Sequence, residues 1–118
     1  MSGTSERDAV PAGPVDLDHL AAQTFGDDGL RREVLGLFVA QARRLIGEAA
    51  AAEGSRGVVA HKISGSARGI GAVAVAAAAE RVERAAAEGR GDEAAFAALA
   101  TAVDDACRFI EDDLLGGR

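Results

Sequence analysis

The sequence predicts an all-α fold, namely an antiparallel up-down four-helix bundle with a short additional N-terminal helix. Alanine, the best helix former, is the commonest residue. The 2 prolines, Pro11 and Pro14, both lie in the opening segment, so the rest of the chain is free of the strongest helix breaker. Strand signals are nearly absent, because the short valine pairs lie within alanine-rich stretches of helical periodicity.

Two helices are expected in the first half of the chain. The short one begins at Asp16, whose side chain can cap free amide groups, and it stops near Gly26. The second begins after Asp27 and Asp28 and has one apolar and one polar side. Its apolar face consists of Leu30, Val34, Leu37, Phe38, Ala42, Leu45, Ile46 and Ala49.

Three more helices complete the predicted bundle. Gly54-Ser55 ends the second helix and caps the third, which ends around Gly69 and Gly71. The fourth spans about residues 72–88, and Asp92 caps the last. The inward residues of these two helices are Val75, Ala79, Val82 and Ala86, then Phe96, Leu99, Val103, Ala106 and Ile110. Alanine stripes let helix axes approach closely, so the larger residues must supply much of the packing. Among them are Phe25, Phe38, Phe96 and Phe109.

The 118 residues suffice for one domain, with a flexible N-terminal segment at 1–14 and the bundle at 15–118. A net charge of -6 disfavours binding to nucleic acid and to anionic membrane surfaces. No signal peptide or membrane span is evident, so we expect a cytoplasmic protein. Cys107 is the only cysteine, which excludes an intrachain disulfide, and we expect it in the core.

Residues 60–72 are predicted to form a helix with two unlike faces. The inward face has Val59, Ile63, Ser66, Ala67 and Ile70, and the other side has His61, Ser64, Gly65 and Arg68. Gly65 occupies a helix interior, where glycine costs about 1 kcal/mol relative to alanine. Its missing side chain leaves space beside His61 for another protein. Neutral imidazole is a good nucleophile and can form a covalent intermediate, so His61 is the candidate reactive residue.

Other readings of this histidine remain open. A lone histidine on a helix is commonly a solvated or hydrogen-bonded residue without a chemical role. A metal site would need more ligands, and the other histidine, His19, lies on a separate short helix. A hydrolase would need a nucleophile elbow or an oxyanion hole, and neither signature is present.

The chain resembles the histidine-containing phosphotransfer (HPt) domain of bacterial multistep phosphorelays in two-component signalling. The matching motif residues are His61, Ile63, Gly65, Ser66, Gly71 and Ala72. Segments 15–17, 26–28 and 34–38 are similar to the opening helices of such domains. The resemblance therefore covers most of the chain from Val15 onward.

One motif position departs from the family pattern. The lysine expected three residues after the histidine is Ser64 here, and Lys62 lies about 100° further round the helix. The family lysine is thought to offset the charge of the phosphoryl group. Lys62, or Arg68 two turns along the stripe, is a candidate to replace it, and Ser64 itself is expected to face water.

The resemblance also places Glu83 against the ring nitrogen of His61 that is not used for chemistry. In a hairpin turning near Gly71, His61 and Glu83 lie about 14 Å and about 18 Å from the turn, and their side chains lean toward each other. The contact would fix the tautomer and leave the outer nitrogen as nucleophile. The alternative is that Glu83 pairs with a neighbouring arginine on an exposed face.

The resemblance implies a monomeric phosphocarrier. His61 would accept a phosphoryl group from a receiver-domain aspartate and pass it to another receiver, the partners being response regulators or a hybrid histidine kinase. No cofactor of its own is expected, magnesium belonging to the receiver, and without a kinase motif or ATP site the chain is not an enzyme in the usual sense. Docking would use an apolar patch near the first two helices and a polar rim with Lys62 and Arg68. The rival functions are a receiver-binding module that carries no phosphate and a helical-bundle enzyme or metal carrier.

Overall fold

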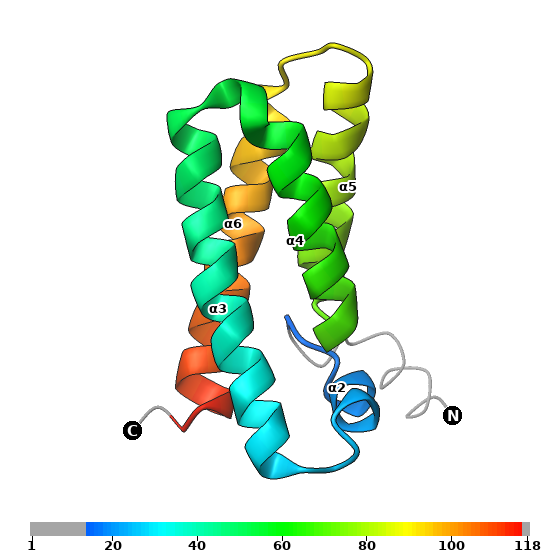
Figure 1. The fold of residues 1–118 in the computed structure, drawn as a ribbon, viewed down its shortest axis with the longest axis vertical. Helices are drawn as coiled ribbons and strands as arrows, with labels where there is room; N and C mark the ends of the chain where they lie inside the picture. The colour runs from blue at the N-terminus through cyan, green and yellow to red at the C-terminus, as the bar shows by residue number, and fades with distance from the viewer. Residues whose placement is uncertain (1–13, 117–118) are drawn as a thin grey trace, which may run out of the picture.

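The computed structural model describes residues 14–116, and in this part of the chain four long helices stand side by side with a short helix at one end (Figure 1). The elements are α2 (Leu17–Gln23), α3 (Asp28–Ala51), the 3-10 turn η1 (Glu53–Ser55), α4 (Arg56–Ile70), α5 (Val73–Ala87), α6 (Glu93–Phe109) and the π-helical turn η2 (Ile110–Leu114). Each long helix contacts the next along the chain, and α6 returns to α3. The predicted all-α bundle with a short preceding helix is confirmed. The expected N-terminal segment lies, apart from Pro14, outside the described residues.

Asp16, Asp92 and Gly71 lie at the helix ends that the capping pattern indicates. Asp16 accepts a hydrogen bond from the backbone N–H of His19, and Asp92 accepts one from that of Ala95, each at the start of a helix. Gly71 ends α4 with a φ of 78°, a conformation that glycine adopts without strain. Ser55 precedes α4 but does not cap it, because its Oγ donates to the carbonyl of Ala52 instead.

Helix α2 is tied to the end of α4 by two contacts. The backbone N–H of Asp16 donates to the carbonyl of Gly71 over 2.8 Å. The Nε2 of His19 lies 2.9 Å from the carbonyl oxygen of Arg68, which can only accept a hydrogen bond. A Cβ at Gly71 would come within 3.0 Å of Asp16, so the two segments are in close contact. These contacts hold the last turn of α4 in place. Figure 1 shows α2 beside that end of α4.

The core follows the predicted faces with three exceptions. All five predicted inward residues of the last helix are buried, four in α6 and Ile110 at the start of η2, as are Phe38 and Leu45 of α3. Phe25 was expected to pack between helices but is 87% exposed, because α2 ends before it and it lies in the connecting turn with a φ of 56°. Leu37 is 64% exposed, since the buried stripe of α3 runs through Leu35, Val39 and Ala42. Ala86 is exposed as well.

Helices α4 and α5 approach closely near Gly57. A Cβ built on Gly57 would lie 2.8 Å from the Cβ of Ala86, closer than two carbon atoms can pack. Ala86 therefore lies beside α4 although it is exposed. The small residues at this point allow the close approach that the alanine-rich composition predicts.

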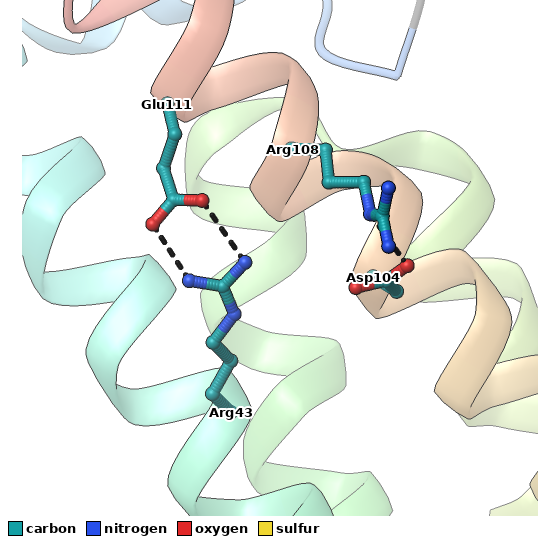
Figure 2. A network of polar contacts seen from close by, with 4 residues as sticks. All are labelled: Arg43, Asp104, Arg108 and Glu111. Carbon is teal, nitrogen blue, oxygen red and sulfur yellow. Dashed lines mark hydrogen bonds and ion pairs between the residues drawn. The ribbon is translucent and has the colours of Figure 1, made fainter. Parts of the chain in front are cut away.

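The C-terminal turn η2 is attached to α3 by charged side chains. Arg43 of α3 donates two hydrogen bonds to the carboxylate of Glu111, at 2.6 Å and 3.0 Å (Figure 2). Arg32 of α3 donates to the carbonyl of Leu115 over 3.0 Å. The neighbouring Asp104–Arg108 pair lies within α6 (Figure 2). The two arginines thus hold the end of the bundle against α3.

The Arg43–Glu111 contact predicts a pH dependence of stability. The hydrogen bond from Arg43 lowers the pKa of Glu111 from its ordinary value of 4.5. A carboxyl group with a lowered pKa in the folded state stabilises that state above its unfolded pKa, and the contribution is lost as the pH falls through the folded value. We expect the Glu111→Gln variant to melt below the wild type at pH 7 and the difference to shrink below about pH 4. Thermal melts of both proteins across this range check the prediction; a constant difference would contradict it.

Cys107 is fully buried on α6, as the sequence predicts. Burial raises the pKa of the Cys107 thiol, which disfavours the reactive thiolate. The side chain therefore acts as a core residue in the folded protein.

Candidate functional site

His61 projects from the outward face of α4 toward solvent, with its side chain 81% exposed. Its Nδ1 lies 2.7 Å from Oε2 of Glu83 on α5. Because an ionised carboxylate can only accept, this contact places the ring hydrogen on Nδ1. The Nε2 of His61 is left with a free lone pair, which is the nucleophilic form of the ring.

A second contact joins the same two helices. Arg68 of α4 forms an ion pair with Glu80 of α5. Glu80 and Glu83 are three residues apart and hence neighbours on one side of α5. Glu83 therefore contacts His61 while the arginine of α4 pairs with Glu80. We call the line of contacts formed by His61, Arg68, Glu80 and Glu83 the α4–α5 seam.

The prediction that Ser64 faces water is wrong. Ser64 is buried, and its Oγ has no hydrogen-bond partner among the described residues. It is three residues after His61 and four before Arg68, which both contact α5, so it lies on the side of α4 that faces α5. Its small side chain fits between the helices, and it brings no charge to the exposed face.

Gly65 and Lys62 stand on the exposed face of α4. A Cβ added at Gly65 would meet nothing within 4 Å, so the protein's own packing does not require glycine there. Lys62 has no ion-pair partner within residues 14–116 and lies about 100° from His61 round the helix. Of the residues predicted for the site, the structure thus brings His61 and Glu83 into contact and leaves Lys62 outside the seam.

A groove of about 470 Å³ lies between α2, α3 and α4, beside this face. Its apolar part includes the exposed Leu37 of α3, and it extends to Gly69, one turn from Gly65. Ser66 donates a hydrogen bond to Gln41 of α3 over 2.7 Å and so links the two helices at the groove. The full lining is Gln23, Thr24, Val34, Leu37, Phe38, Gln41, Arg44, Ser66, Gly69 and Ile70.

The sequence reasoning missed Glu80 and the lining of the groove. The sequence contains a signal for Glu80, because this residue stands one turn before Glu83 and faces the same neighbouring helix. The sequence contains no signal for the groove, since the groove depends on how far α2 and α3 stand from α4. Within residues 14–116, no group of three or more His, Cys, Asp or Glu side chains is arranged to hold a metal ion.

None of the helices described between residues 14 and 116 combines the length and hydropathy of a membrane span.

Comparison of the chain's sequence with known protein families finds a match. The family model described as Hpt domain matches residues 33–109, more than half of the chain, from the second turn of α3 to the end of α6. Searches of curated proteins and of solved structures each return no match. Helix α2 lies outside the matched residues, whereas His61, Gly65 and Glu83 lie within them. Hpt domains take part in histidine phosphotransfer and are phosphocarriers rather than kinases. The chain therefore belongs to the Hpt domain family of phosphorelay signalling.

Proposed function

We propose that Nε2 of His61 accepts a phosphoryl group from the aspartyl phosphate of a receiver domain and passes it to the aspartate of a second receiver. The exposed imidazole with its Nδ1 held by Glu83 is the observation that carries the proposal. It presents a nucleophilic nitrogen that a protein as large as a receiver can reach. The family match supports the same chemistry.

The transfer uses groups that the site holds in position. The lone pair of Nε2 attacks phosphorus while the bond from phosphorus to the aspartate oxygen breaks, so the carboxylate leaves with the bonding electrons. The ring gains positive charge, and its Nδ1–H remains bonded to Glu83, whose negative charge offsets that gain. Transfer to the second receiver reverses these steps. We expect any magnesium ion that neutralises the phosphoryl oxygens to be bound by the receiver.

The receiver is proposed to dock over His61 and Gly65 and into the neighbouring groove. Leu37 offers exposed apolar surface there, and Lys62 and Arg68 supply charged groups at the rim. A partner that must leave after each transfer needs only a small interface, below about 1,200 Å² in total. The open space above Gly65 lets the backbone of the receiver come close to the imidazole of His61.

The test is transfer from an aspartyl-phosphorylated receiver, followed by intact mass and acid treatment. We expect an acid-labile gain of one phosphoryl group in the wild type and none in His61→Gln. His19→Gln is the matched control, because His19 is the other histidine and its Nε2 is held by the backbone carbonyl of Arg68, so it is not free to attack phosphorus. A gain that survives in His61→Gln, or is lost only in His19→Gln, would refute the assignment to His61.

The burial of Ser64 favours one alternative function. Without a lysine at that position, the chain could bind a receiver and carry no phosphate. This module would show no mass gain with any receiver, yet would still bind the receiver in a titration that His61→Gln leaves unchanged.

A further inference from the structure

Phosphorylation of His61 adds negative charge at the α4–α5 seam. A phosphoryl group on Nε2 adds up to two negative charges, while Glu83 already balances the positive charge that the ring gains and Glu80 is paired with Arg68. The whole chain has a net charge of -6. Ser64 is buried and uncharged, so it cannot offset the added charge. A cation near His61 is needed to stabilise the phosphorylated state.

Arg68 is the cation that shares the stripe of His61. The two residues are seven positions apart, which is about 10.5 Å along the helix axis. Long side chains on a helix lean toward its N-terminus, so Arg68 leans toward the turn that contains Gly65 and His61 leans toward the turn before its own. An extended Arg68 side chain is therefore needed to span the separation. Gly65 stands between them without a side chain, and the space above it is open. No side chain at Gly65 thus stands in the way when the guanidinium of Arg68 turns toward a group bound to Nε2.

Lys62 is less well placed although it is the neighbour of His61 in sequence. Adjacent residues on a helix do not face each other, and Lys62 lies about 100° round from the histidine, away from the seam. The backbone at Arg68 is in addition held in place, because the carbonyl oxygen of Arg68 lies 2.9 Å from Nε2 of His19.

The present partner of Arg68 is easily exchanged. The Arg68–Glu80 pair is exposed to solvent, the arginine side chain by 59%, and exposed ion pairs contribute little to stability. A phosphoryl group offers three acceptor oxygens and more charge than a carboxylate, and the planar guanidinium binds it through two hydrogen bonds. Arg68 thus gains a stronger partner when His61 is phosphorylated.

We propose that Arg68 is the phosphoryl-binding cation of this site and that it leaves Glu80 for the phosphoryl group when His61 is phosphorylated. Glu80 is then a positioning residue that holds Arg68 against α5 in the free protein. The proposal rests on the proposed function, because it requires phosphohistidine at His61.

The test needs a phosphoryl donor that does not depend on docking. Phosphoramidate transfers its phosphoryl group to a histidine nitrogen as its own P–N bond breaks and ammonia leaves. The readout is the pH midpoint of the ³¹P NMR shift of phosphohistidine, because a bound cation favours the dianion and lowers the midpoint. Four variants are compared with the wild type: Arg68→Gln, Glu80→Gln, the double variant, and Lys62→Gln as a control with the same charge change.

We expect Arg68→Gln to raise the midpoint by about one pH unit, a tenfold change in the protonation equilibrium, and Lys62→Gln to shift it much less. Glu80→Gln should lower the midpoint by releasing Arg68, and this effect should disappear when Arg68 is also replaced. If Glu80→Gln shifts the midpoint equally in the wild type and in Arg68→Gln, Glu80 acts through long-range electrostatics only. That result would overturn the proposal that Arg68 moves from Glu80 to the phosphoryl group.

The two proposals fail in different ways. A wild-type protein that is labelled while Arg68→Gln titrates as the wild type overturns the role of Arg68 alone. A wild-type protein that phosphoramidate and phosphorylated receivers both leave unlabelled overturns the phosphocarrier function together with this inference.

Discussion

Replacing Gly65 with leucine is expected to slow phosphoryl transfer from a receiver by about a hundredfold while the fold stays intact. A Cβ at Gly65 meets nothing within 4 Å, so a larger side chain extends into solvent without disturbing the bundle. It would stand beside the imidazole, where the receiver must bring its aspartyl phosphate within about 3–3.5 Å of Nε2. A displacement of about 1 Å at a reacting centre is enough for a hundredfold loss.

The measurement is the rate of transfer from a phosphorylated receiver, with labelling by phosphoramidate as the internal comparison. The small donor should still label Gly65→Leu, because it does not need the docking surface. Gly47→Leu is the matched control, since Gly47 is a helical glycine of α3 with equally open surroundings and is not part of the groove. Transfer to Gly65→Leu at the wild-type rate would mean that the receiver does not approach over α4.

Replacing Gly57 with alanine is expected to destabilise the protein by about 1–3 kcal/mol. The new Cβ would lie 2.8 Å from the Cβ of Ala86, and neither atom belongs to a flexible side chain that can turn aside. Helices α4 and α5 would have to separate near this point, which disturbs the packing of Val59 and Val82 in the core.

Gly65→Ala is the matched substitution in the same helix. Alanine there meets nothing and has the better helix propensity, so stability should rise by up to about 1 kcal/mol. Urea unfolding of both variants, followed by circular dichroism, gives the two free energies of unfolding. A Gly57→Ala protein at least as stable as the wild type would contradict the close approach of α4 and α5 at Gly57.

The helix boundaries could be predicted because they depend on local chemistry. Asp16, Asp92 and Gly71 act through backbone groups within a few residues, and the structure places each at the predicted helix end. The inward face of α6 could likewise be predicted from the spacing of its large residues. The exposure of Phe25 could not be predicted, because side-chain type alone does not show that a residue lies in a turn with positive φ.

The site could be predicted where the family resemblance applies to it. The resemblance placed Glu83 against His61, the rise per residue and the place of the turn are compatible with that contact, and the structure shows the two side chains in contact. Ser64 was misplaced because a small polar residue gives no hydrophobic signal when it is buried between helices. The groove beside Leu37 depends on helix separation, which periodicity does not specify.

The burial of Cys107 gives the protein a built-in reporter of its own opening. It is the only sulfhydryl in the chain, and a thiol reagent can reach it only when α6 leaves the bundle. The rate of its modification under native conditions therefore measures how often that opening occurs, without any added label. Variants at the surface of α4 can be compared by this rate, which separates a loss of transfer caused by loosened structure from one caused at the reacting nitrogen.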